Sequence, residues 1–202
     1  MEVLKKKFFT EQEYLEFERE SPTKNEFYRG EIFAMAGASL SHNSVVANLI
    51  FILIDQLKNK PWRVYPSDLR LRVNKSGLYT YPDVSIFCGE PILVEGTKDT
   101  VTNPTVLIEV LSDSTEKYDR GKKFQFYREI QSLKEYVLVS TTHKLVEIFR
   151  KNTDGNWLLL DSIEKESISL ESVECILKIK DLYNGITIPE DIKFGQRIGD
   201  SI

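Results

Sequence analysis

The stretch Thr105-Val-Leu-Ile-Glu-Val-Leu111 carries a single carboxylate, Glu109, inside a run of aliphatic residues. Continuous apolar character over such a length is typical of a central β-strand that is covered on both faces. Burying an unpartnered carboxylate costs much free energy, so Glu109 needs a cation, a hydrogen-bond network or an exposed strand end. A structural ion pair with a nearby Lys or Arg meets this need as well as a metal ion does, and the spacing alone does not separate the two.

A second carboxylate, Asp83, stands near the start of another predicted strand, Tyr81–Cys88, directly after Pro82. Proline is tolerated at the first residue of a strand, and Asp83 by itself is also explained as a turn residue at the strand entry. Two acids on consecutive strands, however, can converge on one cation. Their hard oxygen ligands suit Mg²⁺ or Mn²⁺.

The third candidate group lies in Asp119-Arg-Gly-Lys-Lys123, on a helix predicted to run roughly from Glu116 to Ile130. Asp119 and Lys123 are four residues apart, which favours a helical salt bridge worth about 0.3 kcal/mol. The alternative is that Lys123 reaches over the strand end toward the two acids. There it would stabilise charge on a phosphate or orient the attacking water.

The remaining elements follow from local patterns and complete a mixed α/β (α+β) fold with one central sheet and a buried helix against it. The two predicted helices are a short one that starts at the capping box Thr10-Glu-Gln-Glu13 and ends at about Glu20, and Ser41–Lys60, with Ser41 as N-cap and apolar residues around nearly its whole circumference. The predicted β elements are a hairpin over Glu26–Met35, the strands Trp62–Val73, Glu135–Ser140, Lys144–Arg150 and Trp157–Leu160, and short C-terminal segments with a helical turn ending near Tyr183.

Composition bounds the class of protein. The chain has 202 residues, 41% of them hydrophobic, which predicts one domain over residues 1–202 with a full core. The net charge of −4 argues against strong non-specific nucleic-acid binding. It does not exclude a nuclease, because acids that hold a cation add negative charge that the cation then reverses locally.

Other classes of site and location are disfavoured by missing patterns. The two histidines and the distant Cys88 and Cys175 match no zinc or redox spacing, and no P-loop or G-x-S-x-G motif is present. We expect reduced thiols in a soluble, cytoplasmic protein, since no apolar stretch follows the charged N-terminus and the most apolar run, Val45–Ile54, is half of a membrane span. His42 is a lone histidine, more often structural than catalytic, and Asp68, Arg70 and Arg72 are predicted to be sheet-edge, solvated charges.

Taken in order, these motifs resemble the PD-(D/E)XK nuclease signature. The wider pattern resembles the Uma family of putative restriction endonucleases, in the restriction-endonuclease-like superfamily. The matching segments span about residues 8 to 185 and are Asn25–Glu31, Ser41–Asn43, Tyr65–Arg70, Tyr81–Val84, Ile108–Thr115, Tyr118–Phe124 and Leu133–Tyr136.

The resemblance implies an αβββαβ core and hydrolysis of DNA phosphodiesters with Mg²⁺ or Mn²⁺. Asp83 and Glu109 would be the metal ligands, with the backbone carbonyl of Val110 as a third. Many related folds act as homodimers with one active site per DNA strand, so a homodimer is expected.

One position departs from the motif. The superfamily lysine normally lies two residues after the acid, where this chain has Leu111. The resemblance suggests that this lysine has moved to the helix, at Lys123, because a lysine stem can span a turn and deliver its ammonium group to the strand end. His42 and Glu31 are accessory candidates.

Two alternatives to a DNA endonuclease stay open. A catalytically inactive module on the same fold would bind nucleic acid or a protein partner, as the acidic net charge and the missing strand lysine allow. A metal-dependent hydrolase could also act on another phosphate compound. Clustering of Asp83, Glu109 and Lys123 would favour either enzyme over the inactive module.

Overall fold

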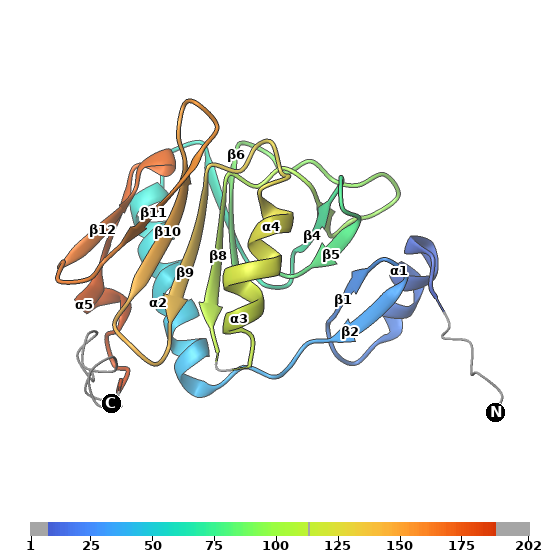
Figure 1. Ribbon diagram of the computed structural model, residues 1–202, viewed down its shortest axis with the longest axis horizontal. Helices are drawn as coiled ribbons and strands as arrows, with labels where there is room; N and C mark the ends of the chain where they lie inside the picture. Colours follow the sequence, from blue (N-terminus) through green and yellow to red (C-terminus); the bar gives the residue numbers. More distant parts are fainter. Residues whose placement is uncertain (1–7, 113, 189–202) are drawn as a thin grey trace, which may run out of the picture.

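The computed structural model describes residues 8–112 and 114–188 (Figure 1). A six-stranded mixed sheet forms its centre. In spatial order its strands are β11 (Trp157–Asp161), β10 (Val146–Lys151), β9 (Glu135–Ser140), β8 (Val106–Leu111), β6 (Val84–Cys88) and β3 (Trp62–Pro66). Strand β8 pairs parallel with β9 and antiparallel with β6. The predicted central sheet is therefore present, and the α+β class is confirmed.

A second sheet, which the sequence did not indicate, lies beside the first. Its spatial order is β2 (Glu31–Ala34), β1 (Asn25–Tyr28), β5 (Leu78–Thr80), β4 (Arg70–Val73) and β7 (Thr100–Val101). The predicted N-terminal hairpin is its β1–β2 edge. Helix α1 (Glu11–Glu20) precedes it and carries the predicted capping box at Thr10 and Glu13. The C-terminal elements are β12 (Ser167–Leu170), a 3₁₀ turn (Glu171–Val173), β13 (Cys175–Lys178) and α5 (Ile179–Leu182), ending next to Tyr183 as predicted.

The predicted single strand Trp62–Val73 is wrong, because β3 and β4 belong to different sheets. Arg70 is also not solvated: it is 3% exposed, lies between the rings of Tyr14 and Tyr81, and donates to Asp99 at 2.8 Å. Asp68 is exposed, as expected, and pairs with Lys24. The chain bends between the two strands so that β4 can pair with β5 and bury its guanidinium among aromatic rings.

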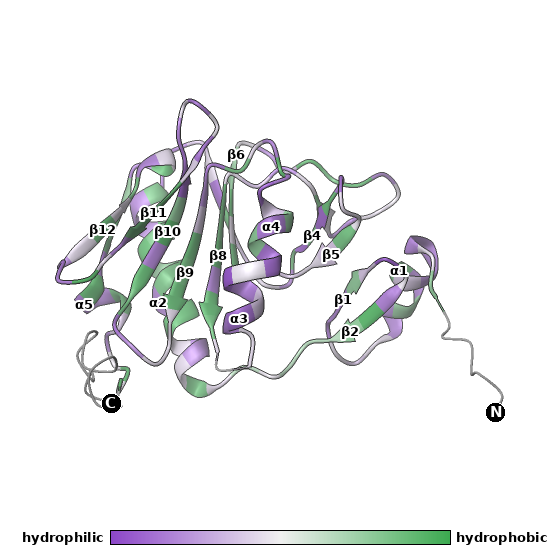
Figure 2. Ribbon diagram, viewed as in Figure 1, coloured by the Kyte–Doolittle hydropathy of each residue, from purple (hydrophilic) through white to green (hydrophobic). Residues whose placement is uncertain are grey.

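Strand β8 is buried along its whole length, which confirms its central position. Its two faces pack against different partners, since successive side chains point to opposite sides. Val106, Ile108 and Val110 join the cluster around helix α2 (Leu40–Leu57), whereas Leu107 and Leu111 join the cluster of Phe126, Tyr127 and Ile130. Figure 2 shows hydrophobic residues along the inner strands of the sheet and on α2. Glu109 therefore points away from α2, toward the chain segment that follows β8.

Helix α2 begins earlier and is less enclosed than predicted. Ser39, not Ser41, caps it by accepting from the backbone N–H of His42 at 3.2 Å. Its buried side chains form one stripe, Val45, Leu49, Leu53 and Leu57, while Phe51 on the outer side is 73% exposed. The predicted packing on several sides is wrong for that outer side, because the sheet covers one side of the helix only.

By length and composition alone, α2 is long and apolar enough to cross a membrane, with a mean hydropathy of 1.3 over 18 residues. Here it serves as a core helix against the six-stranded sheet. Its polar side chains bond to neighbouring elements: the Asn48 amide donates to the Leu182 carbonyl at 2.9 Å, and the Gln56 amide donates to the Ile176 carbonyl at 2.8 Å.

The two sides of α2 are expected to respond differently to truncation. Leu49→Ala should lower the free energy of unfolding by about 2–5 kcal/mol, because Leu49 is fully buried and leaves a cavity. Phe51→Ala should change it by less than about 0.5 kcal/mol. Urea unfolding followed by circular dichroism measures both, and equal losses would contradict the packing described here.

Both cysteines are free thiols. Cys88 is exposed at the end of β6 and Cys175 is buried in β13.

Candidate active site

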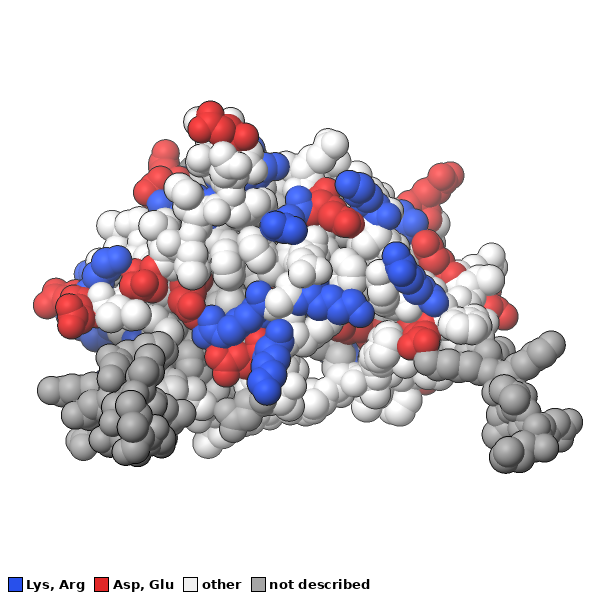
Figure 3. Space-filling model, viewed as in Figure 1, with Lys and Arg blue, Asp and Glu red and all other residues white. Residues whose placement is uncertain are grey.

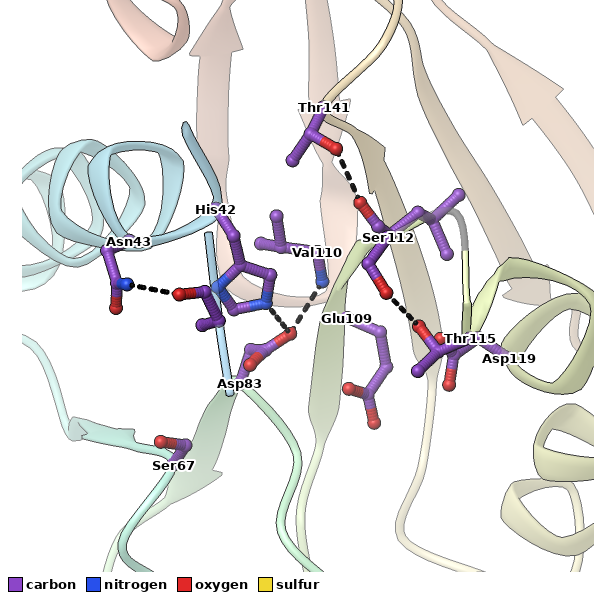
Figure 4. A network of polar contacts seen from close by, with 12 residues as sticks. His42, Asn43, Ser67, Asp83, Glu109, Val110, Ser112, Thr115, Asp119 and Thr141 are labelled. Atoms are coloured by element: carbon purple, nitrogen blue, oxygen red, sulfur yellow. Dashed lines mark hydrogen bonds and ion pairs between the residues drawn. The ribbon is translucent and has the colours of Figure 1, made fainter. Parts of the chain in front are cut away.

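The candidate site lies where β8 ends and β6 begins. Antiparallel pairing sets Val84 opposite Ile108, which places Asp83 beside the carboxyl-terminal half of β8. The Asp83 Oδ2 atom accepts from the Val110 backbone N–H at 2.8 Å and lies 3.1 Å from His42 Nε2 (Figure 4). Asp83 is thus held by a strand on one side and by the first turn of α2 on the other.

Glu109 is the second carboxylate and is buried, with 4% of its surface exposed. Its Oε1 atom lies 2.9 Å from Lys123 Nζ and accepts from the Tyr127 hydroxyl at 2.7 Å. Burial raises the pKa of Glu109 to about 8, although the neighbouring ammonium of Lys123 opposes this rise. The carboxylate is therefore costly to keep ionised without cationic partners.

Lys123 is enclosed by three carboxylates, and its side chain is only 5% exposed. Besides Glu109, its ammonium lies 3.3 Å from Glu26 and 3.4 Å from Asp119. Burial alone would lower the pKa of Lys123, but these carboxylates, Glu109 foremost, raise it well above the ordinary value. Lys123 is thus a fixed, buried cation at the strand end. It forms the predicted salt bridge with Asp119 and also contacts Glu109, one of the two acids toward which the alternative directed it.

The local backbone explains how one short segment delivers both Asp119 and Lys123. The predicted continuous helix Glu116–Ile130 is instead α3 (Glu116–Tyr118), a π-helical turn η1 (Asp119–Lys123) and α4 (Phe124–Tyr127). Such π turns inside helices are frequent at functional sites. Here the turn is held in place because the Tyr136 hydroxyl donates to the Asp119 carbonyl at 3.1 Å.

Glu26, on β1, is a site residue that the sequence did not single out. Its Oε1 atom accepts from the Thr80 hydroxyl and lies near Lys123, and its Oε2 atom accepts from the Tyr118 hydroxyl at 3.2 Å. The only signal lies in the segment Asn25–Glu31, in which Glu31 is the accessory candidate. The contact with Lys123 belongs to Glu26, whereas Glu31 lies across the hairpin on β2, opposite Tyr28.

The donor set suits some divalent cations and not others. Among residues 8–112 and 114–188, the hydrogen bonds of Asp83 fall on Oδ2, and the hydrogen bond and nearest ion-pair contact of Glu109 fall on Oε1. Figure 4 shows the two carboxylates on neighbouring strands, side by side. No three His, Cys, Asp or Glu side chains in that part of the chain are grouped closely enough to enclose a metal. Mg²⁺ is commonly held by one or two carboxylates, with waters and substrate phosphates completing its shell. The pair fits such a hard cation and does not fit a closed zinc site.

Charge supports the same conclusion. Glu109, Glu26 and Asp119 are three largely buried carboxylates around one lysine, and Asp83 is a fourth carboxylate nearby that contacts His42. The carboxylates outnumber the fixed cation, so a bound divalent cation would reduce the excess of negative charge. His42 supplies a polar contact to Asp83, with Nε2 at 3.1 Å from Oδ2. The arrangement brings together Asp83, Glu109, Val110, Lys123 and His42, and it leaves Glu31 outside these contacts.

Comparisons with known proteins show the family to which the chain belongs. Residues 11–178 match the family model Uma2, described as "Putative restriction endonuclease". Two proteins of Synechocystis sp., named uncharacterized proteins sll1609 and slr1290, are 38% and 34% identical to this chain. The alignments cover 80% and 87% of this chain and 91% of each relative.

A solved structure shares the fold. The crystal structure of a putative nuclease belonging to DUF820 from Anabaena variabilis superposes with a TM-score of 0.67 at 19% identity, over 85% of this chain and 96% of that one. Fold and family description together support a nuclease-type function. The family model spans most of the 202 residues, and this chain therefore belongs to the Uma2 family of putative restriction endonucleases.

Proposed function

We propose that this protein is a Mg²⁺- or Mn²⁺-dependent DNA endonuclease whose metal ligands are Asp83 and Glu109. The observation that carries the proposal is the pair of uncommitted oxygens, Asp83 Oδ1 and Glu109 Oε2, beside a buried lysine that lies 2.9 Å from Glu109. Two carboxylates, which are hard oxygen donors for a cation, and one ammonium are groups that metal-dependent phosphodiester hydrolysis can use. DNA as the substrate is supported by the description of the family.

Each residue then has a defined part in the reaction. When bound, the cation would polarise the phosphate and lower the pKa of the attacking water. Asp83 is kept in position by the Val110 N–H and by His42, so its free oxygen faces the substrate without rearrangement. The carbonyl of Val110 stays a predicted third ligand.

Lys123 would stabilise negative charge that develops on the phosphate, since its ammonium is held protonated by the surrounding carboxylates. Tyr127 fixes the other oxygen of Glu109 and so sets the direction in which Oε2 points. A homodimer with one site for each strand and a cytoplasmic location stay predictions.

The direct test incubates the protein with labelled duplex DNA, single-stranded DNA and RNA in Mg²⁺, in Mn²⁺ and in EDTA. The proposal expects internal cleavage of DNA in either metal and none in EDTA. Cleavage of RNA but not of DNA would show that the substrate is RNA instead of DNA. A folded protein that binds DNA without cutting it under any condition would support the inactive module instead.

Glu26 is expected to act as a positioning residue for Lys123. Glu26→Gln should lower kcat by about ten- to hundredfold through misplacement of the ammonium, with little change in KM for DNA. Glu31→Gln is the matched comparison from the same hairpin and should have the smaller effect. Steady-state cleavage kinetics measure both variants. An equal or larger loss of kcat for Glu31→Gln would contradict the assignment of Glu26 as the positioning residue.

A further inference from the structure

The outer side of the segment α3–η1–α4 carries exposed cations that the proposed chemistry does not use. We call this group, together with one residue from the β1–β2 turn, the basic ridge; its members are Arg29, Lys117, Lys122 and Arg128. None of them forms an ion pair with a residue in the described parts of the chain. Figure 3 shows several Lys and Arg side chains on this face, over α3 and α4, with fewer Asp and Glu side chains between them. On a protein with a net charge of −4, this is a local concentration of the opposite sign.

Two members of the basic ridge are held against the same aromatic ring. Lys122 Nζ lies 5.1 Å from the centre of the Tyr28 ring, and the Arg29 guanidinium lies 5.2 Å from it. Tyr28 is itself packed on Phe126, with the ring centres 4.7 Å apart. The ring attracts both cations, and neither has an ion-pair partner among residues 8–112 and 114–188. Both cations are therefore available to an anionic ligand.

The basic ridge is joined to the candidate active site through one strand and one turn. Glu26 and Tyr28 point to the same face of β1, because side chains two residues apart share a face. Glu26 contacts Lys123, and Tyr28 contacts Lys122. One face of β1 therefore contacts two adjacent lysines of η1. Lys123 is buried at the carboxylates, and Lys122 is exposed on the ridge.

We infer that the basic ridge binds the sugar-phosphate backbone of the nucleic acid that the site cleaves, an inference that rests on the proposed function. Its members are long, exposed cations without an ion pair among the residues that the structure describes, which suits phosphate contacts and gives no means of reading bases. The basic ridge thus fixes the position of the nucleic-acid strand relative to Asp83 and Glu109. It also accounts for nucleic-acid binding by a chain whose overall charge opposes it.

The test measures binding of a fluorescent DNA duplex by anisotropy in EDTA, across a series of salt concentrations. The double variant Arg29→Gln/Lys122→Gln is compared with Lys58→Gln/Lys165→Gln, which removes the same charge from exposed lysines paired with Asp55 and Asp161 elsewhere. The ridge variant should bind at least about tenfold more weakly, and the slope of log K against log [salt] should fall by about 1 for each phosphate that the variant no longer neutralises. The control variant should bind like wild type.

Equal affinities and slopes for the two double variants would overturn the inference, as would absence of binding by wild type. Metal-dependent cleavage by wild type, scored in a separate reaction, distinguishes the failures. If wild type cleaves DNA and the ridge variant binds and cleaves equally well, the inference about the basic ridge is wrong while the proposed nuclease function is supported. If wild type neither binds nor cleaves DNA, both fail.

Discussion

Lys123→Met is expected to lower the free energy of unfolding by about 3–5 kcal/mol, the range found when one partner of a buried ion pair is removed. The reason is that this lysine forms ion pairs with three carboxylates. Without the ammonium, Glu109, Glu26 and Asp119 would face one another in a largely buried volume with no cation between them. The variant should also lose cleavage, measured at a temperature at which it remains folded.

Urea unfolding gives the measurement, and the neighbouring residue gives the control. Lys122→Met removes the same charge from the same turn but from an exposed position that has no ion pair within residues 8–112 and 114–188, so its effect should stay within about 0.5 kcal/mol. Adding Glu109→Gln to Lys123→Met should recover part of the lost stability, because one uncompensated carboxylate is removed. Equal midpoints for the two single lysine variants would show that Lys123 is not the buried cation described here.

Glu109→Gln is expected to separate activity from stability. Cleavage should fall by about 10³-fold or more, corresponding to about 4 kcal/mol of transition-state stabilisation that a metal ligand supports. The free energy of unfolding should change by no more than about 1.5 kcal/mol, because Lys123 keeps Glu26 and Asp119 as partners and Tyr127 can still donate to the glutamine oxygen.

Single-turnover cleavage and calorimetric titration with Mn²⁺ test this expectation together. The matched variant Glu147→Gln changes a carboxylate that pairs with Arg120, and it should leave both metal affinity and cleavage near wild type. Unchanged Mn²⁺ affinity in Glu109→Gln would remove Glu109 from the metal site and leave it as a partner of Lys123 alone.

The parts of the site that follow from local sequence were predictable. A lone carboxylate in an aliphatic run marks Glu109, because the burial cost makes the residue conspicuous. Lys123 could be proposed because it lies on the predicted helix that follows the Glu109 strand. In the structure its ammonium lies 2.9 Å from Glu109. Its role in catalysis stays part of the proposal.

The parts that depend on contacts between distant segments were not predictable. Glu26 comes from the other sheet, and no local pattern distinguishes it from Glu31 until β1 is placed against η1. The burial of Arg70 depends likewise on two aromatic rings from α1 and the loop before β6. Alternation along Trp62–Val73 could not reveal that the chain changes sheets within it.

The exact ends and local forms of the helices could not be predicted, for a different reason. Ser39 and Ser41 are equally good helix caps by type, and only the bond to the His42 N–H selects Ser39. The π turn η1 adds no residue signature that separates it from an ordinary helix. The shared cause is that neighbouring conformations differ by little free energy locally, so tertiary packing decides between them.

Nicking of supercoiled plasmid in Mn²⁺ and Mg²⁺, by wild type beside Asp83→Asn, tests the central claim most directly. Asparagine can still accept the Val110 N–H, so the fold is retained while the charge that would hold the cation is lost. We predict metal-dependent nicking by wild type and none above background by Asp83→Asn. Nicking at equal rates by both proteins, or no nicking by folded wild type with either metal, would contradict the claim that Asp83 and Glu109 form a metal-dependent nuclease site.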